Sequence, residues 1–219
     1  EISWLRNTRH GYEAELYTDL GNDVVNTKQT FNLASLSFES QEMLSLSVSH
    51  YTDQPNKDFD ISDGTVIPAG NYEWWDARLS LNTGLYRKFA AANSYTLGRF
   101  YDGDRQQLSS TLVYRPTKRI SLTLGYSLNL IDWEQFEDST INLISGRIQY
   151  SFTPDLTLFN LIQYDDISNS IGINSRLQWE YKPGAKMFFV VNHGYIDEMT
   201  GFVIKDLEVV AKIGGLFRF

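Results

Sequence analysis

Apolar and polar side chains alternate along most of this chain of 219 residues. The alternation is clearest between residues 118 and 132, and it is repeated at 144–152 and 171–181. In the first segment one face would carry Ile120, Leu122, Leu124, Tyr126, Leu128 and Leu130. A period of two is the pattern of a β-strand whose two faces meet different surroundings. The sequence therefore predicts an all-β protein.

Twelve alternating segments are separated by turn or loop residues, so we expect twelve strands. Their expected ranges are 10–18, 29–38, 43–52, 71–82, 85–101, 105–115, 118–132, 139–153, 155–165, 169–182, 186–195 and 204–219. Many of these ranges exceed about ten residues, whereas strands of soluble proteins usually have about five or six. An even number of long strands is typical of bacterial outer-membrane barrels.

The connections between the expected strands alternate in length. Tight connections containing Pro or Gly are expected at 82–84, 115–118, 153–155 and 182–185. Longer and more acidic connections are expected at 19–28, 51–71, 101–105, 132–139 and 194–204, with a short one at 165–169 on the same side. Short turns on one rim and long loops on the other indicate an outer-membrane β-barrel. A soluble β-sandwich also alternates, but Arg and Glu within the long strands favour a hydrated lumen.

The predicted fold is an antiparallel transmembrane β-barrel domain over residues 1–219. Lipid offers no hydrogen bonds to an open sheet edge, so the sheet must close. Either these twelve strands close alone or upstream strands complete a larger barrel. The chain begins at Glu1 with neither Met nor a signal peptide, so we expect a mature chain or a C-terminal fragment of a longer one.

Composition excludes several other classes of protein. No window approaches the ~20 apolar residues of a membrane-spanning helix, and the mean hydropathy is -0.31. The chain has no cysteine, which excludes disulfides and cysteine-ligated metals. The net charge is -8 and no basic run is present, so we expect no nucleic-acid partner.

The last residues resemble the barrel-assembly signal of outer-membrane proteins. The residues that match this signal are Lys212, Gly214, Phe217 and Phe219. The resemblance implies recognition by the barrel-assembly machinery and a periplasmic C-terminus in the outer membrane of a Gram-negative cell. Aromatic residues before the tight turns predict a girdle at the boundary between lipid and water. The expected girdle residues are Tyr114, Phe152, Trp179 and Tyr181.

Charged and amide side chains occupy the polar face of several strands. The candidate lumen-lining residues are Asp76, Arg78, Arg147, Gln149, Asn174, Arg176, Gln178 and Glu180. Mixed charges in a lumen can form an ion-pair network that stiffens the barrel, or a polar path that selects solutes by charge and size. Eight strands give a filled interior and sixteen leave a channel. Twelve strands leave both interpretations open.

No catalytic residue, metal or cofactor is assigned. Among the histidines, His10, His50 and His193, the second follows Ser49 and the third follows Asn192, which allows a hydrolase at the outer rim. No nucleophile motif supports this hypothesis. The loop 51–71 carries Asp53, Asp58, Asp60 and Asp63 followed by Gly64, but the spacing does not fit the calcium loop of a helix-loop-helix site. We therefore expect a solvated acidic loop.

Several segments resemble one family in order along the chain. They include Phe59-Asp60-Ile61, Ile67-Pro68-Ala69-Gly70, residues 98–103 and residues 174–184 running into 188–192. The resemblance is to the C-terminal outer-membrane barrel region, a domain of unknown function, of proteins that carry an N-terminal family-9 carbohydrate-binding-like domain. It implies an outer-membrane location and further chain upstream of Glu1.

These observations lead to three functional hypotheses. The first is an outer-membrane channel for polar solutes such as oligosaccharides. The second is a structural anchor that binds envelope partners. The third, an enzyme at the outer rim, is the least favoured.

Overall fold

The computed structural model describes residues 3–62, 65–84, 86–198 and 201–215. Within these ranges no helix is both long and apolar enough to span a membrane. The long strands are β1 (Leu5–Thr18), β2 (Val24–Phe38), β3 (Met43–Asp53), β6 (Tyr72–Asn82), β7 (Phe89–Phe100), β8 (Gly103–Thr117), β9 (Ile120–Trp133), β10 (Ser139–Thr153), β11 (Leu156–Asp165), β12 (Ser170–Lys182), β13 (Ala185–Glu198) and β14 (Gly201–Gly215). A separate hairpin is formed by β4 (Phe59–Ser62) and β5 (Thr65–Ile67).

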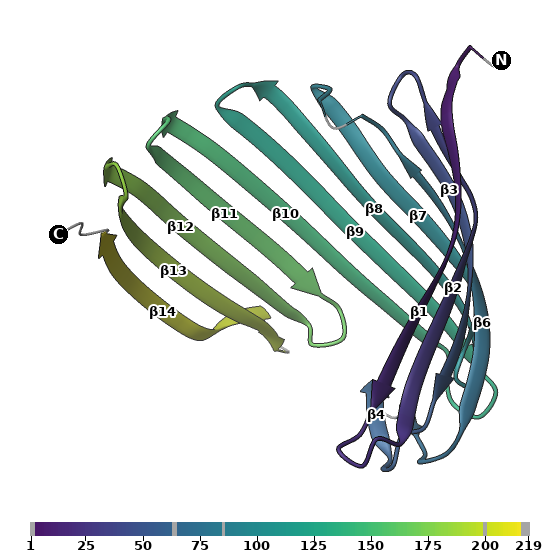
Figure 1. Cartoon of the computed structure of the whole chain (residues 1–219). Coiled ribbons are helices and arrows are strands. Elements are labelled where there is room, and N and C mark those ends of the chain that lie inside the picture. The colour runs from purple at the N-terminus through teal and green to yellow at the C-terminus, as the bar shows by residue number, and fades with distance from the viewer. Residues whose placement is uncertain (1–2, 63–64, 85, 199–200, 216–219) are drawn as a thin grey trace. The chain divides into compact units, whose positions relative to one another are not determined.

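The twelve long strands form one sheet in chain order, from β1 to β14. Consecutive strands lie side by side and are joined at alternating ends, as Figure 1 shows. Every pair whose register is defined is antiparallel, from β1 with β2 to β13 with β14. The prediction of an all-β fold with twelve antiparallel strands is confirmed. The first strand begins at Leu5, upstream of the expected start at residue 10.

The chain forms two compact units. Unit 1 contains residues 1–85, 91–110 and 127–141, and unit 2 contains residues 86–90, 111–126 and 142–219. Unit 1 therefore includes β1 to β6, most of β7 and the adjoining ends of β8 and β9. Unit 2 includes the other ends of β8 and β9, most of β10 and the strands β11 to β14.

Asp58 and Asp60 are exposed, as the prediction of a solvated acidic loop requires, but apolar residues of the same loop join a small cluster in unit 1. Ile67 in β5 is fully buried against Ile131 and Trp133, and Phe59 and Tyr101 pack on the same cluster. The loop is rich in acidic residues, but its apolar residues lie in the hairpin of β4 and β5 and pack against this cluster, away from water. One carboxylate of the loop forms a local hydrogen bond, since Asp58 accepts the Ala69 N–H at 2.8 Å.

One predicted turn is displaced along the chain. Residues 115–118 were expected to connect two strands, but β8 continues through Arg115 and Pro116 to Thr117, and β9 begins at Ile120. Proline fixes φ near a value that extended backbone tolerates, so its presence does not end the strand. The Arg119 N–H donates to the Thr117 hydroxyl at 3.2 Å and closes the actual turn.

The register separates the two faces of the sheet in unit 1. Between β3 and β6 the apolar pairs Leu44 with Leu81, Leu46 with Leu79 and Val48 with Ala77 share one face. The alternate pairs on the other face are Ser45 with Ser80, Ser47 with Arg78 and Ser49 with Asp76. The apolar face is exposed, because Leu46, Leu79 and Leu81 keep 39%, 48% and 48% of their surface accessible. Packing within the sheet leaves this apolar surface uncovered.

Candidate functional site

The polar face of unit 1 contains a recess of about 400 Å³. Six strands contribute to it: β1, β2, β3, β6, β7 and β8. Its lining is almost entirely polar, and three of its residues (Ser49, Asp76 and Thr96) are buried. Direct cross-strand pairs such as Thr30 with Ser49 and Arg78 with Thr96 bring these side chains together. We take this recess as the candidate functional site.

A buried ion pair lies within the recess. The Arg105 guanidinium on β8 donates to the Asp76 carboxylate on β6 at 2.9 Å, and their side chains are only 17% and 5% exposed. Tyr51 donates a further hydrogen bond to Asp76. The guanidinium also lies 4.7 Å from the centre of the Phe100 ring, an arrangement that favours a cation. Asp76 is thus held in place from two neighbouring elements.

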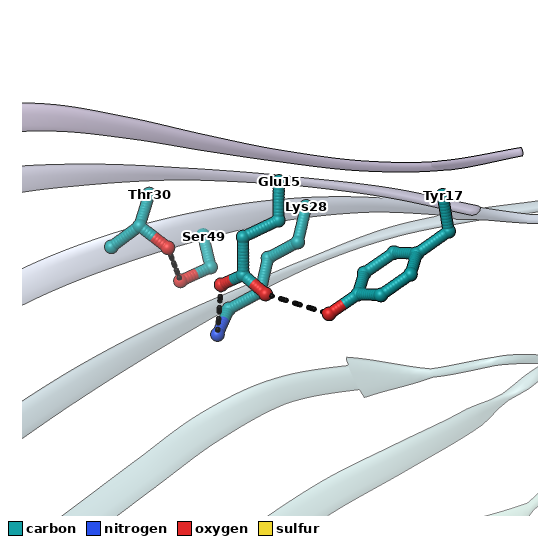
Figure 2. Close-up of polar contacts among 5 residues, drawn as sticks. All are labelled: Glu15, Tyr17, Lys28, Thr30 and Ser49. Atoms are coloured by element: carbon teal, nitrogen blue, oxygen red, sulfur yellow. Dashed lines mark hydrogen bonds and ion pairs between the residues drawn. The ribbon is translucent and has the colours of Figure 1, made fainter.

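A second and more exposed ion pair crosses β1 and β2. Figure 2 shows the Glu15 carboxylate between the Lys28 ammonium, at 3.4 Å, and the Tyr17 hydroxyl, at 3.2 Å. Beside this pair, the Thr30 and Ser49 hydroxyls are 3.2 Å apart. The arrangement follows from the register, which places Glu15 directly opposite Lys28. Most charges of this face therefore balance one another.

Two charged residues of the recess, Glu13 and Arg78, are in no ion pair among the described residues, and Arg78 is the cation of the two. It donates to the Ser94 hydroxyl at 2.8 Å, and in the described part of unit 1 no carboxylate forms an ion pair with it. A guanidinium bonded to one hydroxyl keeps several N–H donors for other partners. Arg78 is therefore the cation of the recess whose charge is most available to a solute.

Beyond the residues that line the recess, Tyr101 packs against the apolar cluster of Ile67, and it was not among the predicted site residues. The Tyr101 hydroxyl donates to the Asp53 carboxylate at 2.6 Å, and the Tyr101 ring contacts Trp74 and Phe59. Burial and the Asp53 carboxylate raise the pKa of the Tyr101 phenol above its ordinary value of 10.0. The phenol consequently remains a donor at neutral pH and ties the turn at residues 101–102 to the end of β3.

Asp76 and Arg78 were predicted to share this face, whereas Glu15, Lys28 and Arg105 were not among the predicted site residues. Glu15 stands at an alternating polar position of its strand. Lys28 lies in the connection expected at 19–28 and Arg105 at the boundary of the connection expected at 101–105, so periodicity gave no clear signal for the face of either. Periodicity gives no signal for their partners, because pairing depends on the register between strands.

The six predicted lumen residues of unit 2 share one face of β10 and β12. Cross-strand rows join Arg147, Leu161 and Asn174, and also Gln149, Phe159 and Arg176. The Arg176 guanidinium lies 4.7 Å from the centre of the Phe159 ring. Near the tight turns Glu180 pairs with Lys186 at 3.3 Å. The predicted face is correct, but apolar residues such as Phe159 and Phe188 make it less polar than expected.

The expected girdle residues are all exposed. Trp179 and Tyr181 contact each other edge to face near the turn that joins β12 and β13, with ring centres 6.1 Å apart. Phe152 stands next to the turn between β10 and β11, and Tyr114 lies near the end of β8. Their membrane role stays a prediction.

The assembly signal is only partly within the described residues. Lys212 and Gly214 lie on β14 opposite Phe188 and Lys186. Phe217 and Phe219 lie outside the described residues.

The histidines do not form the contacts that the hydrolase hypothesis requires. The His50 ring bonds Glu73 at 2.8 Å and packs on Trp75, while Ser49 points to the opposite face of β3. His193 bonds the Tyr195 hydroxyl at 2.9 Å, while Asn192 points to the opposite face of β13. His10 bonds the Leu33 carbonyl. Among the described residues no cluster of His, Cys, Asp or Glu could hold a metal ion.

Comparisons with known proteins give structural likenesses only. No family model and no curated protein matches this sequence. The KdgM porin in complex with disordered oligogalacturonate is similar over 96% of this chain and 98% of its own, at 14% identity and a TM-score of 0.37. The NanC porin in a rhombohedral crystal form is similar over 97% and 100%, at 11% identity and a TM-score of 0.39. No family membership follows from likenesses of this size.

Proposed function

We propose that this chain forms the wall of an outer-membrane β-barrel channel for polar solutes such as oligosaccharides. The observation that carries the proposal is the two-faced sheet of unit 1. One face exposes Leu46, Leu79 and Leu81, and the other combines hydroxyls with Lys28, Arg78 and Asp76. A lipid-facing wall around a hydrated lumen requires this division.

The exposed apolar face supports a membrane location. In the described residues only five hydrophobic side chains are buried, namely Ile67, Trp74, Ala90, Ile131 and Trp133. Water-soluble monomers rarely expose contiguous apolar patches larger than a few hundred Å². In a bilayer, lipid would cover the apolar face of every strand, so the sheet would need no hydrophobic core.

Insertion in lipid imposes a condition on the edge strands β1 and β14. Their unpaired N–H and C=O groups cannot remain unpaired in lipid, since each would cost several kcal/mol. Pairing with each other would close twelve strands. Pairing with further strands would build a larger barrel, as the family resemblance implies. In either arrangement the polar face lines the interior.

The charges of the recess favour polar solutes over strongly charged ones. Lys28 is neutralised by Glu15 and Arg105 by Asp76, which leaves Glu13, Arg78 and a row of hydroxyls to meet a solute. Channels conduct when contacts are favourable enough for entry and weak enough for exit. Hydroxyl-lined walls satisfy both conditions for sugars.

The orientation of the barrel in the membrane is part of the same proposal. We place the C-terminus in the periplasm, with the assembly machinery as a partner that reads Lys212, Gly214, Phe217 and Phe219. The tight turns would then lie on the periplasmic side and the hairpin of β4 and β5 outside the cell.

A structural anchor is the second candidate function. It is favoured by the same ion pairs, since a lumen cross-linked by Glu15 with Lys28 and by Asp76 with Arg105 is stiff. An anchor needs no open path, so conductance separates the two functions.

The test is reconstitution of the folded chain into planar bilayers. A channel gives discrete conductance steps, and maltose enters vesicles that contain it at a rate well above the rate for protein-free vesicles. Electrically silent bilayers containing demonstrably folded protein would overturn the channel and leave the anchor.

A pair of adjacent substitutions tests the assignment of the two faces. Leu79→Lys places a charge on the apolar face, where it is expected to cost about 2–4 kcal/mol if that face meets the bilayer midplane. Ser80→Lys places the same charge on the polar face of the same strand and should cost less than about 1 kcal/mol. Urea titration in lipid vesicles measures both. Equal losses would contradict a lipid-facing Leu79.

A further inference from the structure

A second recess lies on the polar face of unit 2, across β11 to β14, and encloses about 320 Å³. We propose that it is a binding subsite for an uncharged sugar residue. This inference rests on the proposed channel function, because the same face would line the lumen. It names the solute class more narrowly, as neutral rather than acidic sugar.

The floor of the recess has no side chains. Gly172 on β12 and Gly194 on β13 are direct cross-strand partners, and Gln163 and Asp206 flank them in the same row. No heavy atom lies within 4 Å of the point that a Cβ on Gly172 would occupy. The Asp206 carboxylate leans over Gly194 instead, with Oδ1 at 2.5 Å from the corresponding point. A flat ring can therefore approach the backbone at Gly172, beside the Asp206 carboxylate.

A chain of amides borders this floor. Asn174 donates to Asn192 at 2.5 Å, and Asn192 donates to the Glu208 carboxylate at 2.9 Å. Each side-chain amide has two donor hydrogens and an accepting oxygen, so both retain capacity for a ligand. The internal bonds fix the orientation of the amides before a solute arrives, which reduces the entropy lost on binding.

Two charges of opposite sign complete the lining. A register shift between Gly194 and Tyr195 marks a bulge at Lys205, so that Lys205 and Asp206 line the same recess. Bulges commonly re-aim a side chain in this way. Among the described residues neither of them is in an ion pair. An ammonium only donates and a carboxylate only accepts, while the amides do both.

Sugar hydroxyls match this set of donors and acceptors. Each hydroxyl donates one hydrogen bond and accepts others, so neighbouring hydroxyls can bond Lys205, Asp206 and Asn174 together. Leu161, which pairs with Asn174, offers an apolar surface to the C–H groups of the ring. With Glu208 at the border, the carboxylates outnumber the ammonium, so an acidic sugar meets repulsion.

The volume of the recess suits one or two sugar rings bound weakly. It stands at the lower end of the ~300–1,000 Å³ that is usual for small-molecule sites. Weak binding is also what a conducting lumen requires. We expect a dissociation constant on the order of 1 mM, equivalent to a standard binding free energy near -4 kcal/mol.

The experiment compares two glycine substitutions in the full chain folded in detergent. Gly172→Val fills the floor with a side chain, and valine suits a strand, so folding is preserved. Gly146→Val is the control, because Gly146 also has open space at its Cβ point but faces the apolar side opposite Ile162. Saturation-transfer NMR with maltohexaose should show binding weakened about tenfold or more in Gly172→Val, and within about twofold of wild type in the control.

Charge is tested with oligogalacturonate as the acidic probe. Wild type should bind it more weakly than maltohexaose, and Asp206→Asn should raise its relative affinity. The inference is overturned if wild type shows no saturable binding of maltohexaose, if both valine variants bind alike, or if the acidic probe binds as well as the neutral one. Conductance distinguishes the failures: a conducting barrel without binding refutes the subsite alone, while binding without conductance refutes the channel alone.

Discussion

Arg105→Ala is expected to lower the free energy of unfolding by about 3 kcal/mol or more, the cost of leaving one partner of a buried ion pair alone. The Asp76 side chain is 5% exposed and receives the guanidinium at 2.9 Å. Without Arg105 the carboxylate keeps only its bond from Tyr51. Urea titration of the protein in lipid vesicles measures the loss.

The exposed pair of the same face provides the matched control. Lys28→Ala removes the partner of Glu15, whose side chain is 38% exposed, and water then solvates the carboxylate. Exposed pairs contribute about 0–1 kcal/mol, so the loss should be small. The double variant Asp76→Ala with Arg105→Ala should recover part of the stability lost in Arg105→Ala, because it buries no unpaired charge. Equal losses for Arg105→Ala and Lys28→Ala would contradict the burial of the Asp76 pair.

Gly98→Ala is expected to destabilise unit 1 by about 1–3 kcal/mol, since a methyl group would be forced against backbone. Its Cβ would lie 2.4 Å from the Trp75 carbonyl oxygen and 2.5 Å from the Asp76 Cα. Backbone atoms of a paired strand cannot move away as the end of a long side chain can. The register explains the closeness, because Gly98 is the direct partner of Asp76.

Gly146→Ala is the control for this second prediction. Gly146 also lies within a strand, but no heavy atom lies within 4 Å of its Cβ point. Alanine should be neutral or slightly stabilising there, because glycine loses more conformational freedom on folding. Urea titration of both variants gives the comparison. A Gly98→Ala variant as stable as Gly146→Ala would show that β6 and β7 are less closely packed than described.

Sequence periodicity predicted the twelve long strands, and the face that Asp76 and Arg78 share, because both are local properties. Side chains of a strand alternate with a period of two, so the position of Asp76 and Arg78 on one polar face follows from their spacing alone. The same rule located Asn174, Arg176 and Gln178. Strand ends were less certain, as Pro116 shows by lying inside β8.

The sequence by itself determined an all-β chain with twelve long two-faced strands, and it indicated which side chains share a face. Only the tertiary structure decided which of these side chains contact one another. Arg105 reaches Asp76 from 29 positions away, and Gly172 and Gly194 form one floor, because the registers of their strands bring them together. The hairpin of β4 and β5 also depends on tertiary packing, because Ile67 is buried by Ile131 and Trp133 from distant segments. Periodicity fixes the direction of a side chain, whereas its neighbours depend on register and packing across the sheet.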